Sequence, residues 1–134
     1  MNGKFHCKGI RVYANQNRYE GEFINGKPSG KGTFSFNNGN KYVGELKDTK
    51  FNGKGIFSLN NGNRYEGNFS NGKFAGQGTY IYANGDKCSG NFTDGDLRGQ
   101  VVCQYANGDK YEGEFSNGNR NGKGVYNFAD GTRL

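Results

Sequence analysis

A pattern that recurs every 23 residues constrains the fold of this 134-residue chain more than any other feature. Residues 1–18 match only the second part of a unit, so they form a truncated repeat. Full repeats occupy residues 19–41, 42–64, 65–87, 88–110 and 111–133. Because the repeats cover essentially the whole chain, we expect one domain in which each unit packs against its neighbours.

Each unit has the pattern of a β-hairpin. In the third full repeat, residues 65–69 and 76–82 alternate with period two, and turn-forming residues lie at 70–75 and 83–85. Between repeats, a segment such as Asn37-Asn38-Gly39 suits a three-residue loop with glycine in the left-handed conformation. The sequence therefore predicts an all-β protein, an elongated, twisted, single-layer antiparallel sheet of about eleven strands, roughly 50 Å long at about 4.8 Å per strand.

Comparison of the repeats with one another predicts the strand register. Two columns carry opposite charges in the same repeats and are neutral in the same repeats, as direct cross-strand partners should. The predicted partners are Glu22 and Lys31, Glu45 and Lys54, Asn68 and Gln77, Asn91 and Gln100, and Glu114 and Lys123. The same register places Phe23 opposite Gly30 and Tyr19 opposite Phe34.

This register predicts two ladders on one face of the sheet. The aromatic ladder is Tyr19, Phe34, Tyr42, Phe57, Tyr65, Tyr80, Cys88, Cys103, Tyr111 and Tyr126. The glycine ladder is Gly21, Gly32, Gly44, Gly55, Gly67, Gly78, Gly90, Val101, Gly113 and Gly124. Since glycine has no side chain, the rings can lie flat across it, and one sheet can bury its own aromatics without a second layer.

Twist should bend such a sheet into a shallow trough whose aromatic face is partly exposed. We expect a protein partner to bind there, because tyrosine combines a rigid ring with a polar tip. The predicted partner-binding residues are Tyr19, Phe34, Tyr42, Phe57, Tyr65, Tyr80, Tyr111 and Tyr126.

The segments YEGEFINGKPSGKGTFSFNNGNK, YEGNFSNGKFAGQGTYIYANGDK and YEGEFSNGNRNGKGVYNFADGTR resemble the MORN (membrane occupation and recognition nexus) repeat. The resemblance covers essentially the whole chain. It implies an elongated sheet of hairpins and a role as a non-catalytic adaptor or scaffold. Some members of that family hold a partner's tail in a groove, and others have been linked to acidic phospholipids.

The alternative function is a peripheral membrane tether that binds acidic phospholipids. A basic column could meet lipid phosphates, although nearby glutamates dilute its field; it comprises Arg18, Lys41, Arg64, Lys87, Lys110 and Arg133. A second column lies at the hairpin tips, where Phe51 and Phe74 are the strongest apolar candidates. The tip residues either fold back over their own sheet or form an exposed ridge; they are Phe5, Pro28, Phe51, Phe74, Leu97 and Arg120.

Other functions receive little support. The single histidine, His6, lies beside Cys7 without a local acidic partner, so a hydrolase-like dyad ranks third and we expect no enzyme. No ligand spacing indicates a metal or cofactor, and a net charge of +6 is modest for nucleic-acid binding. Without a signal-like N-terminus, we expect a cytoplasmic protein, at the cytoskeleton or inner membrane surface. The two outer strands offer edges for self-association.

The repeat at residues 88–110 departs from the pattern at three positions. Cys88 and Cys103 replace ring positions and should face each other, and Val101 replaces a glycine. A valine would collide with a ring lying over it, so the smaller thiols relieve the crowding. We expect reduced thiols, with a cross-strand disulfide as the alternative. The missing rings predict a notch between Tyr80 and Tyr111 that could hold a partner's side chain.

Overall fold

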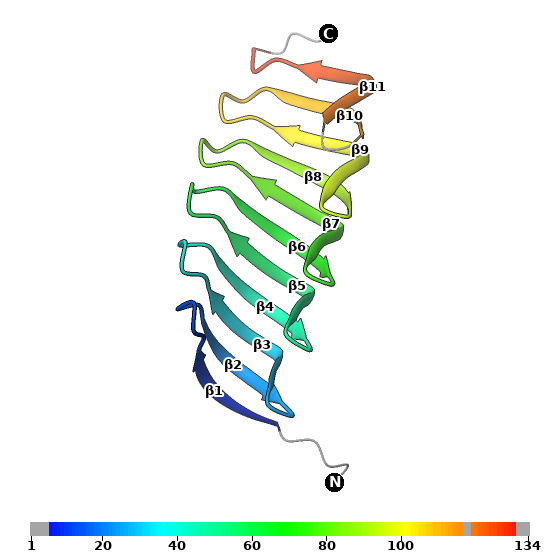
Figure 1. Ribbon diagram of the computed structural model, residues 1–134. Helices are drawn as coiled ribbons and strands as arrows, with labels where there is room; N and C mark the ends of the chain where they lie inside the picture. Colours follow the sequence, from blue (N-terminus) through cyan, green and yellow to red (C-terminus); the bar gives the residue numbers. More distant parts are fainter. Residues whose placement is uncertain (1–5, 117–118, 131–134) are drawn as a thin grey trace.

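A computed structural model describes residues 6–116 and 119–130 and shows a single antiparallel sheet in which eleven strands follow one another in sequence order (Figure 1). The sheet is open, and β1 and β11 lie at its edges. The strands are β1 (His6–Val12), β2 (Arg18–Ile24), β3 (Lys27–Ser35), β4 (Lys41–Lys47), β5 (Lys50–Ser58), β6 (Arg64–Ser70), β7 (Lys73–Ile81), β8 (Lys87–Thr93), β9 (Asp96–Gln104), β10 (Lys110–Ser116) and β11 (Asn119–Asn127). The described part of the chain contains no helix long and apolar enough to cross a membrane.

Both predicted ladders are present. Phe34 lies opposite Tyr19 on one side and Tyr42 on the other, and the glycines align in the same way. The predicted three-residue loops are also confirmed. Gly39 has a φ of 96°, and its N–H donates a hydrogen bond to the carbonyl of Phe36 at 3.0 Å.

The predicted register is wrong beyond the glycine ladder. A β-bulge follows Gly21, so Phe23 lies opposite Pro28 rather than Gly30. At the bulge, the Glu22 carboxylate accepts the backbone N–H of Lys31 at 2.7 Å.

Consequently the predicted charge pairs are not direct cross-strand partners within their hairpins. Glu45 lies opposite Lys31 of the preceding repeat, while its carboxylate accepts the backbone N–H of Lys54 at 2.6 Å. The same correction applies to the other predicted pairs. Asn68 lies opposite Lys54, and Gln77 lies opposite Asn91, which also lies opposite Arg98 on its other side. Glu114 lies opposite Gln100, and the bulge in the last hairpin separates Glu114 from Lys123.

The bulge bends each hairpin toward its aromatic face. Gly53 sits in this bend with a φ of 97°, and a Cβ atom there would lie 2.7 Å from the Glu45 carboxylate. Figure 1 shows the sheet curling at this end of successive hairpins. The curl carries the hairpin tips over the aromatic ladder.

The core is a line of tyrosines lying on glycines. Tyr19, Tyr42 and Tyr65 are fully buried. A Cβ atom at Gly55 would lie 2.5 Å from the Tyr42 hydroxyl oxygen and 2.6 Å from its ring, so no side chain fits there. The expectation that rings cross the glycine ladder is therefore confirmed.

At the ends of the strands away from the hairpin tips, the inter-repeat turns are joined by a line of hydrogen bonds. The Asn40 side-chain oxygen accepts the N–H of Asn60 at 2.9 Å, and the Asp86 carboxylate accepts that of Ala106 at 2.8 Å. The same position in the neighbouring repeats makes the same bond. These bonds couple each turn to the next, in addition to the strand pairing.

Candidate functional site

The hairpin tips cover the aromatic ladder of their own repeats. Phe51 stacks on Tyr42 and Phe74 on Tyr65, each with ring centroids 3.9 Å apart. The guanidinium of Arg120 lies 5.2 Å from the centre of the Tyr111 ring. Pro28 and Leu97 occupy the same place in their repeats and are buried, while Phe5 lies outside the described residues. The tips thus take the first of the two predicted arrangements.

This cover limits which ladder residues a partner can reach. Among the eight predicted partner-binding residues, five are buried: Tyr19, Phe34, Tyr42, Tyr65 and Tyr111. The other three, Phe57, Tyr80 and Tyr126, are only partly buried. A partner on this face would therefore meet these three rings rather than the buried tyrosines.

A second row of rings, two residues after the ladder positions, adds to this surface. Tyr82 is 41% exposed, and its ring centre lies 4.9 Å from that of Tyr80. Phe36 and Tyr105 occupy the same position in other repeats and pack against the core from outside. We call this set of partly exposed rings the aromatic strip; it comprises Phe36, Phe57, Tyr80, Tyr82, Tyr105 and Tyr126. The second row was missed as a site, although its signal was present in the recurring aromatic-x-aromatic segment.

The repeat at residues 88–110 interrupts the strip. Cys88 and Cys103 lie opposite each other as predicted, but they form a disulfide with an S–S distance of 2.06 Å, which corrects the expectation of reduced thiols. Their register explains this, because it brings the two Cα atoms to 4.0 Å. Among the described residues, Cys7 is the free cysteine, and it is exposed.

Val101 fills the space that a ring occupies in other repeats. Its side chain is 2% exposed. In the second full repeat the corresponding residue, Gly55, has no room for a Cβ atom beneath Tyr42. A tyrosine at position 88 and a valine at position 101 would therefore collide, as the sequence indicated.

A notch was predicted between Tyr80 and Tyr111. A cavity of about 260 Å³ does lie over the disulfide, but Tyr82 and Tyr105 line it in place of those two tyrosines. Asp86 and Arg120 line it as well, and Asn84, Phe115 and Asn119 complete its wall. The cavity combines aromatic walls with one acidic and one basic group.

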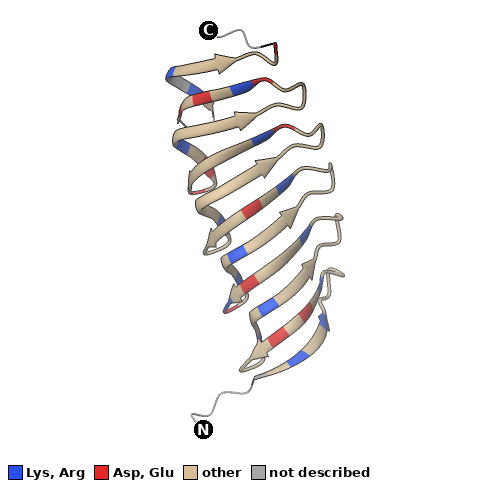
Figure 2. Cartoon of the chain, turned by 180° about the vertical axis from the view of Figure 1, so that it is seen from behind, with Lys and Arg blue, Asp and Glu red and all other residues tan. Residues whose placement is uncertain are grey.

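The basic column lies on the other face, because its residues directly precede ladder positions along the strands. Residues of both charge signs are interspersed along the sheet (Figure 2). Arg18, Arg64 and Lys110 each form a salt bridge with the glutamate two residues later, at 3.3, 2.8 and 3.1 Å. Lys41 and Lys87 are followed at that position by Val43 and Ser89 instead. Arg133 lies outside the described residues. Three of the five described column residues therefore have their charge balanced on the same strand.

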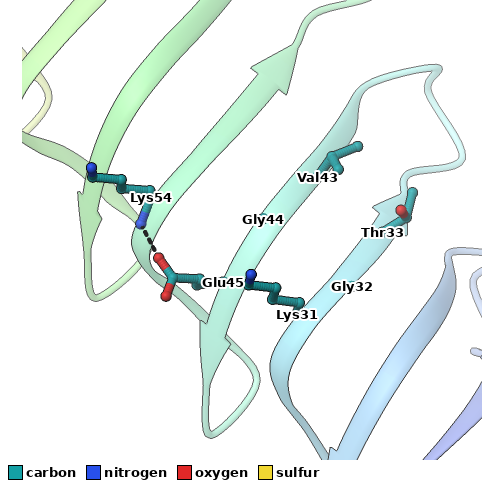
Figure 3. Close-up of a pocket in the computed structure, with 7 residues that line it drawn as sticks. All are labelled: Lys31, Gly32, Thr33, Val43, Gly44, Glu45 and Lys54. Carbon is teal, nitrogen blue, oxygen red and sulfur yellow. Dashed lines mark hydrogen bonds between the residues drawn. The ribbon is translucent and has the colours of Figure 1, made fainter.

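A hollow of about 600 Å³ also lies on this second face, over the glycine ladder (Figure 3). Its sides are formed by Thr33 and Val43 and by the charged side chains Lys31, Glu45 and Lys54. Val43 is 43% exposed. The Glu45 carboxylate on one side of this hollow already accepts a hydrogen bond from the Lys54 backbone N–H, which holds the carboxylate in place.

Catalytic and metal-binding arrangements are not evident in the described parts of the chain. Histidine, cysteine, aspartate and glutamate do not gather there in groups of three that could hold a metal ion. Cys7 is exposed on β1, and the His6 side chain is outside the described set.

Comparison with known proteins places the chain by fold and by repeat. The TCP domain of SAS-4 (dCPAP) of Drosophila melanogaster, solved in complex with a proline-rich motif of Ana2 (dSTIL), has a TM-score of 0.61 and 16% identity. The match covers 95% of this chain and 70% of that chain, and at this identity it establishes the fold alone. No curated protein matches the chain. The MORN repeat matches residues 1–18, 19–41, 42–64, 65–87, 88–110 and 111–133, so this chain belongs to the MORN repeat family.

Proposed function

We propose that this protein is a non-catalytic interaction module that binds a peptide or helix of a partner protein along the aromatic strip. The observation that carries the proposal is a row of partly exposed rings on a sheet over which the described residues place no second layer. Tyr82, at 41% exposed, is the most accessible ring of this row. Rigid aromatic side chains with a polar tip are favourable contact residues for protein partners.

The spacing of the strip suits a regular backbone. Equivalent rings in successive repeats are two strands apart, about 10 Å. A polyproline II segment presents every third residue on one side at about 9.3 Å, and a helix presents every seventh at about 10.5 Å. Either backbone could therefore place side chains against consecutive repeats. The proline-rich motif bound by the SAS-4 TCP domain supports a peptide ligand of this kind.

The test is a selection of binders from a displayed peptide library, followed by affinity measurements with variants. We expect Tyr82→Ala and, separately, Phe57→Ala to weaken the selected peptides at least tenfold. Val43→Ala and Ile56→Ala remove exposed apolar side chains from the opposite face and serve as matched controls. Melting curves establish that each variant is folded. Peptides that bind the strip variants and the controls equally well would rule the strip out.

The membrane tether ranks second. Lys41 and Lys87 favour it, because they lack the glutamate that pairs with their counterparts. Against it, the strongest apolar tips, Phe51 and Phe74, are stacked on core tyrosines. A tether would bind phosphoinositide vesicles with an affinity that falls as salt rises, and Lys41→Gln with Lys87→Gln would abolish the binding.

A further inference from the structure

One position of the aromatic strip lacks its ring, and the next repeat shows what that ring would do. Cys103 stands where Tyr126 stands one repeat later. The Tyr126 ring stacks on Tyr105 with centroids 5.8 Å apart and 22° between the planes. Its hydroxyl donates a hydrogen bond to Oδ2 of Asp109 at 2.9 Å. A tyrosine ring is thus held by one ring and one carboxylate.

The same partners surround Cys103, but nothing from this repeat fills the space between them. Tyr82 corresponds to Tyr105, and Asp86 corresponds to Asp109. Both line the 260 Å³ cavity above the disulfide. The cavity is therefore the place of a missing ring, with the disulfide as its floor.

The carboxylate in this cavity lacks the hydroxyl donor that its counterpart has. Oδ1 of Asp86 accepts the N–H of Ala106, and Oδ2 accepts the Asn84 amide at 3.2 Å. Asp109 makes both of these bonds and also accepts the Tyr126 hydroxyl. Because residue 103 is a cysteine, no tyrosine hydroxyl from this repeat reaches Asp86.

The charge on the other side of the cavity selects among possible occupants. Arg120 lines it and lies 5.9 Å from the centre of the Tyr126 ring. A guanidinium attracts the face of an aromatic ring and repels a second cation. An aromatic ring with a hydroxyl donor therefore satisfies both Arg120 and Asp86, whereas lysine or arginine satisfies only Asp86.

We propose that a tyrosine side chain of the bound partner inserts into this cavity and completes the interrupted ladder. Its ring would lie between Tyr82 and Tyr105, and its hydroxyl would donate to Asp86. The inference rests on the proposed function, since it assigns one contact of a partner that lies along the strip.

The first test compares N-acetyl-tyrosinamide with N-acetyl-phenylalaninamide, because the two probes differ only in the hydroxyl. Titration of ¹⁵N-labelled protein should shift the amide signals of Tyr82, Asp86 and Cys103. A hydrogen bond to a charged group is worth about 1.5–3 kcal/mol, so the tyrosine probe should bind at least about tenfold tighter. Equal binding of the two probes, or shifts elsewhere on the sheet, would overturn the proposal.

The second test fills the cavity from within. Cys103→Tyr restores the missing ring of the repeat and should fill the cavity. Cys103→Ser is the matched control, because it also removes the disulfide but leaves the cavity empty. We expect the tyrosine probe to bind Cys103→Ser and to lose at least tenfold in affinity for Cys103→Tyr. Equal binding to both variants would contradict the proposal, and the two-probe comparison on the unmodified protein holds even if a variant fails to fold.

The selected peptides separate this inference from the proposed function. Phe57 lies outside the cavity, so sensitivity to Phe57→Ala reports on the strip alone. A peptide that depends on Phe57 but binds Cys103→Tyr unchanged would overturn tyrosine insertion and leave the proposed function intact. If the selected peptides bind Phe57→Ala as tightly as the unmodified protein, while the tyrosine probe still binds over the disulfide, the proposed function would be overturned instead.

Discussion

The ring of Phe51 lies flat on that of Tyr42, with centroids 3.9 Å apart and 10° between the planes. Phe74 and Tyr65 repeat this arrangement at 3.9 Å and 9°. The hairpin tip thus covers the core of a sheet for which the described part of the chain provides no second layer. The residue type at the hairpin tip varies between repeats, because any side chain that packs on the tyrosine ring can cover it. The guanidinium of Arg120 covers Tyr111 in this way.

Replacement of Phe51 should therefore destabilise the fold. Because Phe51 is partly buried against Tyr42, Phe51→Ser should lower the free energy of unfolding by about 2–4 kcal/mol. Urea denaturation measures this change. Lys50→Ser, at an exposed position beside it, is the control and should change stability by less than about 0.5 kcal/mol. Unchanged stability of Phe51→Ser would show that the tip does not support the core.

The crowding between Gly55 and Tyr42 predicts that the two positions are energetically coupled. Gly55→Val should destabilise strongly, because a Cβ atom would lie 2.5 Å from the Tyr42 hydroxyl. Tyr42→Cys makes room, as in the repeat that carries Cys88 and Val101. In a double-mutant cycle, the valine should cost at least about 1 kcal/mol less in the Tyr42→Cys background. Additive changes would mean that Val101 and Cys88 are not a compensating pair.

The ladders could be predicted from the sequence because their positions recur in every full repeat except the one at residues 88–110, so a single error in register would have misaligned all of them. The bulge could not, because the matching charges of Glu45 and Lys54 indicated that their side chains are direct cross-strand partners, whereas the Glu45 carboxylate accepts the Lys54 backbone N–H. The shared charge of the two columns was a real signal of proximity within a repeat, since the Glu45 carboxylate binds the Lys54 backbone. It did not indicate direct cross-strand pairing, because Lys54 lies opposite the neutral Asn68.

The exposure of individual rings could not be predicted for the same reason. Without the bulge, the tips point away from the sheet, and tyrosines such as Tyr65 would remain accessible. The bend places Phe74 on Tyr65, which is buried. Tyr82, in the second row, is the ring that stays exposed. A hollow over Cys88 and Cys103 was predictable because it required only that these residues face each other. Its walls, Tyr82 and Tyr105, belong to the second row and were not predicted.

The disulfide between Cys88 and Cys103 predicts the thiol count and a loss of stability on reduction. Unfolded protein without reductant should show one thiol, from Cys7, and reduced protein should show three. A loop of about 15 residues contributes about 3 kcal/mol in the chain-entropy account, so Cys88→Ser with Cys103→Ser should cost about 2–3 kcal/mol. Three thiols without reductant would show that the bridge does not form.

The buried tyrosines predict instability at alkaline pH. Burial raises the pKa of Tyr65 from 10.0 to about 12, and burial also raises that of Tyr42. A raised pKa in the folded state means that the neutral hydroxyl is favoured there. Its contribution is therefore complete below pH 10 and is lost as the pH rises from 10 to 12. Urea denaturation across this window, with tyrosinate absorbance recorded in parallel, should show stability falling as the hydroxyls ionise.

Tyr65→Phe is the control for this prediction. The variant keeps the ring under Phe74 but loses the hydrogen bond from the hydroxyl to the Asn68 carbonyl at 2.8 Å. It should be about 1 kcal/mol less stable at neutral pH. Because it has no hydroxyl to ionise at position 65, its stability should fall less steeply between pH 10 and pH 12. Parallel curves for the two proteins would mean that ionisation of Tyr65 does not drive the alkaline loss.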